Sequence, residues 1–197
     1  MSKPTTKAAQ SEATRTKLLA AARELFGARG YADVGTEEIV RTAGVTRGAL
    51  YHQFTDKRDL FRAVFEDLEA QVITDTAKHL EGETNMVAAL KAGCRGWLEA
   101  CLRPEIEKIV LTDAPAVLGW EEWRAIGERY GLGVVMAMLQ EGMNQGVLAE
   151  QPVRPLGHAV VGMLDEMALY VVRAENRKTA LAEALGILDR LVDSMAV

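Results

Sequence analysis

Apolar residues recur along this chain at spacings of three and four, and no segment shows the strict alternation of a half-buried strand. The first such segment ends near Gly30, a typical C-terminal cap residue. Proline is absent from position 5 to position 103, so long helices there are not interrupted. The pattern predicts an all-α protein. The apolar face of the first helix holds Leu18, Leu19, Ala22, Leu25 and Phe26.

Three helix starts follow within a short stretch. Thr36 precedes two glutamates, and its hydroxyl can accept from free amides while the acids suit the positive helix end. Thr46 can cap a second short helix that runs through residue 53. Thr55 or Asp56 can cap a longer fourth helix. The chain therefore places its shortest helices before residue 56.

The helices lengthen beyond residue 80. Segment 113–120 contains Pro115 and Gly119 and is expected to be a loop or a short turn. Together with the four earlier segments, the pattern predicts about nine helices. The later ones are expected over 86–101, about 105–112, 121–145, about 154–174 and about 178–195.

The segment 36–54 has the pattern of a helix-turn-helix. Gly44 permits the positive φ that a tight turn needs. Ala43 and Ala49 are small, so the two helices can approach each other closely at a steep angle. In this motif the second helix enters the major groove of DNA.

Four residues are expected on the outer face of that second helix. Arg47 can pair bidentately with guanine, and Gly48 permits close approach to bases or backbone. Tyr51 and His52 can donate to phosphates. The alternatives are ordinary ones: Tyr51 and Phe54 could close a small core, and a surface arginine or histidine is usually just solvated.

Residues around the motif add candidate DNA contacts. Thr36 and Thr46 stand at helix starts and can also touch phosphates. Lys57 begins the fourth helix, whose N-terminal amides also favour an anion. A mobile arm along the DNA backbone is expected to carry Lys3, Lys7, Arg15 and Lys17.

Charge is distributed unevenly along the 197 residues. Residues 1–60 hold ten Lys/Arg against seven Asp/Glu, whereas residues 61–197 hold thirteen against twenty-one. A basic head on an acidic body indicates that the head alone meets a polyanion. We therefore divide the chain into a DNA-binding domain, 1–60, and a helical body, 61–197.

The composition excludes several classes of protein. With 49% hydrophobic and 26% charged residues, the chain is globular and not disordered. No run of about 18 apolar residues predicts a membrane span, and the N-terminus lacks the apolar core of a secretory signal. The cytoplasm is the expected compartment.

The body is rich in large apolar side chains, which suits a pocket for a small ligand. For each single residue, a place in an ordinary hydrophobic core is the alternative. His158, Asp165 and Glu166 interrupt an apolar helix and could bind a polar group of that ligand, remain solvated, or reach a dimer partner. The apolar candidates for the pocket are Trp97, Trp120, Trp123, Tyr130, Met136 and Met163.

The last two helices are broadly apolar on several faces, more than a monomer could easily cover. We therefore expect a helix bundle across a twofold axis. The residues predicted for that interface are Leu181, Leu185, Leu188 and Val192.

Catalytic and metal motifs are missing. Serine occurs only at Ser2, Ser11 and Ser194, and no phosphate-binding glycine loop or zinc-protease motif is present. The three histidines lack ligand spacing, so neither a metal nor a cofactor is expected. Cys94 and Cys101 are separated by about 10 Å on one helix, which prevents a disulfide between them, so they are buried small residues or, alternatively, one acts as a redox switch.

Residues 30–64, GYADVGTEEIVRTAGVTRGALYHQFTDKRDLFRAV, closely resemble the DNA-binding domain of TetR-type transcriptional regulators. The resemblance implies an all-helical protein whose N-terminal helix-turn-helix domain is followed by a C-terminal ligand-binding and dimerisation domain. It also implies that Thr36, Arg47, Gly48, Tyr51, His52 and Lys57 occupy positions where family members touch DNA.

The resulting hypothesis is a homodimeric repressor that binds a palindromic operator and is released by a small apolar or aromatic effector. Two recognition helices about 34 Å apart would meet successive major grooves. A sequestering protein with a vestigial DNA head, and an enzyme built in the body, are the alternatives. Salt-dependent, sequence-specific DNA binding distinguishes the repressor from the sequestering protein.

Overall fold

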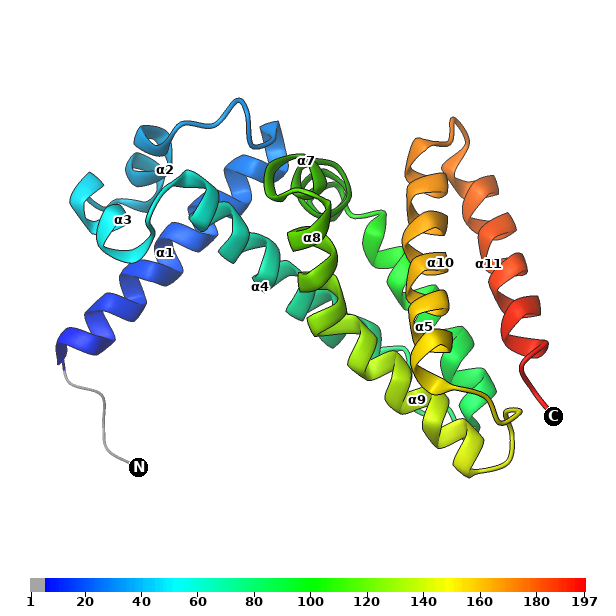
Figure 1. The fold of residues 1–197 in the computed structure, drawn as a ribbon. Helices are drawn as coiled ribbons and strands as arrows, with labels where there is room; N and C mark the ends of the chain where they lie inside the picture. Colours follow the sequence, from blue (N-terminus) through cyan, green and yellow to red (C-terminus); the bar gives the residue numbers. More distant parts are fainter. Residues whose placement is uncertain (1–5) are drawn as a thin grey trace. The chain divides into compact units, whose positions relative to one another are not determined.

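A computed structural model of the chain describes residues 6–197, which are helical almost throughout (Figure 1). By their internal contacts the residues fall into two units. The head unit comprises the chain up to Leu68 together with Pro104–Trp123, and the body unit comprises Glu69–Arg103 and Arg124–Val197. The head unit is therefore larger than the 60-residue domain expected from sequence.

The expected number of helices is confirmed for the described residues. Segments α6, η1 and α7 form one continuous helical stretch, as do α8, η2 and α9, so nine helices result when each stretch counts once. The bounds are α1 Thr6–Arg29, α2 Thr36–Ala43, α3 Arg47–Gln53, α4 Lys57–Lys78, α5 Met86–Cys101, α6 Pro104–Ile106, η1 Glu107–Asp113, α7 Ala114–Leu118, α8 Trp120–Gly127, η2 Glu128–Leu132, α9 Gly133–Asn144, α10 Val153–Arg173 and α11 Arg177–Asp193.

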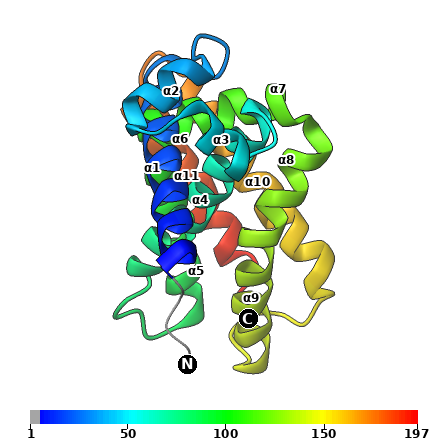
Figure 2. The same ribbon diagram turned by 90° about the vertical axis from the view of Figure 1, so that its left-hand side faces the viewer.

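The head unit is built on aromatic packing between α1 and α4. The Phe26 and Phe61 rings meet edge to face with centroids 5.3 Å apart, and Tyr31 lies 5.1 Å from Phe61. Helix α3 lies beside α1 and α2 (Figure 2). Its Leu50 is fully buried, and Phe54 is 2% exposed, so the core alternative holds for Phe54.

Polar contacts tie segment 104–123 to the first helices of the head unit. Arg23 donates from Nε and Nη2 to the two carboxylate oxygens of Glu105, at 3.0 and 2.6 Å. The Tyr31 amide donates to Asp113 at 2.7 Å. The expected loop over 113–120 is wrong in part, because α7 continues the preceding helix with its proline in the first turn.

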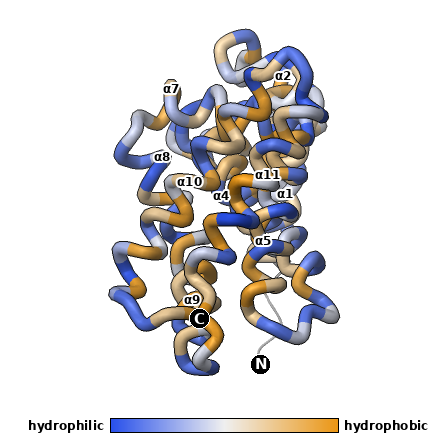
Figure 3. The backbone as a smooth tube through the Cα atoms, turned by 90° about the vertical axis from the view of Figure 1, so that its right-hand side faces the viewer, coloured by the Kyte–Doolittle hydropathy of each residue, from blue (hydrophilic) through white to orange (hydrophobic). Residues whose placement is uncertain are grey.

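The body unit packs α5 against α9, α10 and α11. Hydrophobic residues recur along both α5 and α9 (Figure 3). Gly157 allows α10 to approach α9 closely, because a Cβ there would lie 2.7 Å from Cγ of Met136. The predicted helix over 121–145 is confirmed as a continuous stretch, but its middle, η2, has π-helical geometry.

Helix α10 is the one helix of the described chain whose length and apolar composition would suffice to cross a membrane. A core helix of a globular protein passes the same test, so this is weak evidence. Six of its residues are buried, and Asp165 at its middle pairs with Arg124 at 2.8 Å. These features agree with a helix packed inside the body unit.

Two of the three predicted helix caps are confirmed. The Thr46 hydroxyl accepts from the Ala49 amide, and the Asp56 carboxylate accepts from the Asp59 amide at 2.8 Å. The cap predicted at Thr36 is wrong. Gly35 occupies that position, and Thr36 is already the first helical residue, where its hydroxyl caps no amide.

This difference gives a test of local stability. Thr46→Ala is expected to lower the free energy of unfolding by about 1 kcal/mol, because it leaves the Ala49 amide without its acceptor. Thr36→Ala is the matched control and should change it by a few tenths of that amount. Urea denaturation followed by circular dichroism measures both, and equal effects of the two variants would contradict the cap assignment.

Candidate functional site

The turn between α2 and α3 has the geometry that the helix-turn-helix pattern predicts. Gly44 adopts φ 63° and ψ 36°, a left-handed conformation that few other residues tolerate. Its amide donates to Arg41 O at 3.2 Å, and the Val45 amide donates to Val40 O at 3.0 Å. These bonds satisfy the last carbonyls of α2 and direct the chain into α3.

Helix α3 presents an outer face on which Arg47, Tyr51 and His52 are exposed. The Arg47 guanidinium lies 3.7 Å from a carboxylate oxygen of Glu37 and 5.6 Å from the centre of the Tyr51 ring. Both partners are at the surface, so the contacts are weak and a phosphate or base can replace them. Tyr51 is 45% exposed and does not close a core.

Gly48 is not required by the fold. Its backbone does not need a positive φ, and the nearest atom to an added Cβ would be Thr46 Oγ1 at 4.0 Å. A glycine inside a helix costs about 1 kcal/mol relative to alanine. The bare backbone at this point of the outer face therefore suits an approach from outside the protein.

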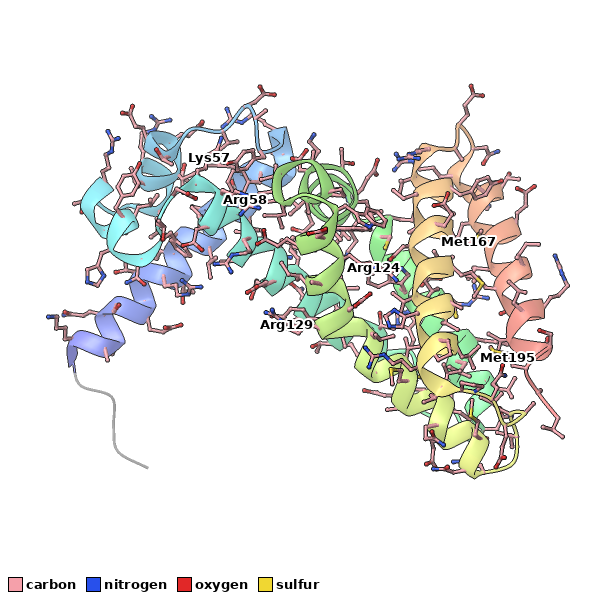
Figure 4. The ribbon with its side chains drawn as sticks, in the orientation of Figure 1. Lys57, Arg58, Arg124, Arg129, Met167 and Met195 are labelled. Atoms are coloured by element: carbon pink, nitrogen blue, oxygen red, sulfur yellow. The ribbon has the colours of Figure 1, made fainter. Side chains whose placement is uncertain are left out.

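The structure changes the role of the Lys57 side chain. Lys57 begins α4 as predicted, but its ammonium donates to Tyr31 O at 2.9 Å and to Val34 O at 3.0 Å. It also lies 3.9 Å from the centre of the Tyr31 ring, and burial lowers its pKa. The ammonium thus supports the loop before α2 (Figure 4), and the backbone amides at the start of α4 remain as candidate phosphate donors.

The predicted basic arm is wrong for three of its four residues. Lys7, Arg15 and Lys17 belong to α1, because the helix begins at Thr6. The Arg15 guanidinium lies 4.6 Å from the centre of the Phe54 ring and packs against the domain. Lys3 lies outside the described residues.

In the body unit, four ionisable side chains form a chain of contacts. Arg124 donates from Nη1 to Asp165 at 2.8 Å and from Nε to Glu128 at 3.1 Å. His158 Nδ1 lies 3.4 Å from the same Glu128 oxygen. The structure therefore brings together two of the predicted polar residues, Asp165 and His158, through Arg124 and Glu128. Glu166 is exposed and outside this group.

A further candidate, not predicted from the sequence, is Glu69, which is 4% exposed in the structure. Burial, and secondarily the charge of Asp165, raises its pKa to about 8, and burial raises the pKa of Asp165 to about 6. The spacing of apolar residues could have predicted this burial. Glu69 follows Phe65 by four residues and precedes Val72 by three, which places it on the apolar face of α4.

The predicted apolar pocket residues are divided between the two units. Trp120 and Trp123 belong to the head unit, where Trp123 is buried and donates from Nε1 to Val110 O at 3.0 Å. Trp123 is therefore a core residue, whereas Trp120 is 65% exposed beside it. The others lie in the body unit, half-buried: Trp97, Tyr130, Met136 and Met163. The indole nitrogen of Trp97 is buried without a hydrogen-bond partner.

The predicted dimer residues are mostly internal. Leu185, Leu188 and Val192 are buried within one protomer, and Leu181 is half-buried. Placing the first three at a dimer interface is therefore wrong, because α11 turns that stripe towards α5 and α10. The exposed apolar residues of the last two helices are Tyr170, Ile187 and Leu191.

Both cysteines are buried in α5. Burial raises the pKa of Cys94 to about 11 and that of Cys101 well above its ordinary value. Since a thiolate is the reactive form, both are inert near neutral pH. Burial in the core is the alternative that this geometry favours over a redox switch.

The buried carboxyl generates a pH-dependent prediction. Glu69 binds its proton more tightly in the folded protein than in the unfolded chain, so its penalty is absent below the ordinary pKa of 4.5 and grows as pH rises towards 8. Glu69→Gln should therefore exceed the wild type in stability by on the order of 4 kcal/mol at about pH 9 and little at about pH 5.

Urea denaturation at both pH values measures this difference. Glu166→Gln, at an exposed carboxylate of α10, is the control and should change the free energy of unfolding little at either pH value. A pH-independent difference for Glu69→Gln would contradict the burial of an unpaired carboxyl.

The fold is shared with known regulators. A TetR-family transcriptional regulator from Pectobacterium atrosepticum superposes with a TM-score of 0.84 at 34% identity, over 96% of this chain and 97% of that one. RolR, solved in complex with resorcinol, superposes with a TM-score of 0.72 over 94% and 95%. At 18% identity, the second likeness shows the fold alone.

Sequence comparisons agree. The Transposon Tn10 TetC protein of Escherichia coli is 26% identical over 163 residues, 81% of this chain and 80% of that protein. The HTH-type transcriptional regulator SrpR of Pseudomonas putida is 38% identical over 89 residues, 43% and 42% of the two chains. The family described as bacterial regulatory proteins, tetR family, matches residues 18–64, and the tetracyclin repressor-like C-terminal domain matches residues 87–195. The chain therefore belongs to the TetR family of helix-turn-helix transcriptional regulators, which are DNA-binding proteins and not enzymes.

Proposed function

We propose that this regulator is a cytoplasmic repressor that binds a palindromic operator as a homodimer and leaves it when a small effector binds the body unit. The observation that carries the proposal is the outer face of α3. Arg47, Tyr51 and His52 are exposed there around a glycine that the fold does not need. Such a face is available to the edges of base pairs in the major groove.

The DNA contacts divide into two kinds. Arg47 reads bases, since a guanidinium matches the two acceptors of guanine. The phosphates are held, and the orientation of α3 is fixed, by Tyr51, His52, Thr36, Thr46 and the first backbone amides of α4. Gly48 lets the backbone of α3 approach the DNA.

An effector in the body unit is supported by a group of half-buried polar side chains. Arg124, Asp165, Glu128 and His158 form a linked group that crosses from α8 through η2 to α10. A π-helical turn such as η2 is found frequently at functional sites. That RolR holds resorcinol supports a small aromatic effector for a protein of this fold.

The dimer is supported by an apolar surface on the last two helices. Ile187 and Leu191 are each 42% exposed one turn apart on α11, and Tyr170 of α10 is 47% exposed. The Tyr170 hydroxyl donates to Glu183 of α11 at 2.8 Å, which joins the two helices at this surface. A second copy of the same face would cover these residues in a bundle across a twofold axis.

DNA recognition is tested first by selecting bound sequences from a random duplex library. The wild type should enrich a palindrome with affinity that falls steeply with salt. Arg47→Ala should weaken operator binding by about 10- to 100-fold, because a bidentate base contact contributes about 1–3 kcal/mol, without lowering stability. A folded wild-type dimer that enriches no sequence at low salt would contradict the proposal.

Gly48→Ala separates folding from recognition. The variant should be more stable by up to about 1 kcal/mol and yet bind the selected operator less tightly, because its methyl group meets DNA. Gly127→Ala is the control, since a Cβ there meets no atom within 4 Å and no DNA contact is proposed for it. Unchanged operator affinity of Gly48→Ala would exclude close approach at this position.

The dimer interface is tested on α11. Ile187→Glu combined with Leu191→Glu should convert the dimer to a folded monomer and remove cooperative operator binding, because two charges would enter an apolar interface. Ala182→Glu adds a charge at an exposed position five residues before Ile187, away from its face, and should leave the dimer intact. Sedimentation equilibrium measures the masses, and a dimer that persists in the double variant would place the interface elsewhere.

A further inference from the structure

Among the described residues, Glu69 is the charged residue that the fold buries, and no cation pairs with its carboxyl group. It is 4% exposed, and the charge that raises its pKa in addition to burial is the like charge of Asp165. Such a group is costly to bury, because it loses hydration and gains nothing in return. An apolar residue would fill this position on α4 better, so the carboxyl is not explained by the stability of the fold.

The charged neighbours of Glu69 cannot neutralise it. The like charge of Asp165 of α10 raises the pKa of Glu69. The charges of Glu69 and Asp165 both raise the pKa of Cys101 of α5. The cation of the group, Arg124, already binds Asp165 and Glu128. The charge of Arg103 lowers the pKa of Cys101, and Arg103 pairs through Nη1 with Asp75 at 2.8 Å, whereas its Nε and Nη2 are buried without a hydrogen-bond partner. The group therefore holds more carboxyls than cations.

The helix that faces Glu69's part of α4 is irregular. A Cβ on Gly131, in η2, would lie 3.9 Å from Cδ1 of Ile73, one turn beyond Glu69 on α4. The same π-helical segment supplies Glu128, which holds both Arg124 and His158. A change at Asp165 can thus reach η2 through Arg124.

We propose that Glu69 and Asp165 form the charged end of the effector site and that the effector is an organic cation, an ammonium or guanidinium group on an apolar or aromatic body. This inference rests on the proposed function, because it names the chemical class of the effector. The cation supplies the charge that Glu69 lacks, and the half-buried aromatic and methionine side chains of the body unit suit the rest of the molecule.

Binding of a cation has a consequence that a neutral ligand would not produce. With its pKa near 8, Glu69 is mostly protonated in the free protein at neutral pH, whereas Asp165 is mostly ionised. A bound cation favours the carboxylate, so Glu69 loses its proton to the buffer as the ligand enters. Binding should therefore release close to one proton per cation near pH 7.

Calorimetry of the full chain without DNA tests this inference. The probes are phenylalkylammonium ions, with phenylalkanols and phenylalkanoates of equal chain length as neutral and anionic comparisons. Titrations in phosphate and in Tris, whose ionisation enthalpies differ, give the number of protons released. We expect the ammonium ions to bind about tenfold or more tightly than the alcohols.

Two variants assign the effect to Glu69. Glu69→Gln should reduce the affinity for the ammonium ions to that for the alcohols and abolish proton release. Its circular dichroism should match the wild type, because the substitution removes a buried charge. Glu166→Gln, next to Asp165 but exposed, should retain both affinity and proton release.

Three results would overturn the inference: equal or tighter binding of the alcohols or carboxylates, no binding of any ammonium probe at millimolar concentration, or full ammonium affinity in Glu69→Gln. A separate titration with the selected operator distinguishes the two proposals. If neutral probes release the operator and cations do not bind, the repressor function stands without a cationic effector. If cations bind with proton release but leave the operator bound, the site stands and ligand-controlled repression fails.

Discussion

Helix α3 has seven residues, too few for a helix to be stable alone in water. Its existence depends on packing, chiefly the complete burial of Leu50 and the near-complete burial of Phe54 against α1. The Gly44 turn sets the direction in which α3 leaves α2, and the Thr46 hydroxyl holds its first turn. Because its inner face is fully used by this packing, the outer face with Arg47 is free for recognition.

The head unit also includes a segment distant in sequence. Arg58, one residue after the start of α4, donates to Val117 O at 3.1 Å and Leu118 O at 2.9 Å, the last carbonyls of α7. It pairs as well with Glu122 of α8 at 2.6 Å. Helix α8 continues into the body unit, where Arg124 follows two residues later. The same helix, α8, therefore holds both Glu122, which pairs with Arg58 of α4, and Arg124, which pairs with Asp165.

The body unit shows why buried charge indicates function more strongly than apolar composition does. Tryptophans and methionines fill cores as readily as they line ligand sites, and Trp123 is an example of the former. A hydrophobic core gains nothing from an unpaired carboxyl such as Glu69, because burying it lowers stability. Regulators retain elements of low stability where a ligand must change the structure.

The helical fold, the helix-turn-helix and the cap at Thr46 could be predicted from the amino-acid sequence, because each depends on residues close together in the chain. Which apolar stripe of α11 is internal depends on tertiary packing, since Leu188 and Leu191 are equivalent until α5 and α10 cover one of them. The inward turn of Lys57, the burial of Trp123 in the core of the head unit and the burial of Glu69 could not be predicted from the sequence either. Each depends on which distant helix packs against a given face, and the local sequence pattern does not identify that helix.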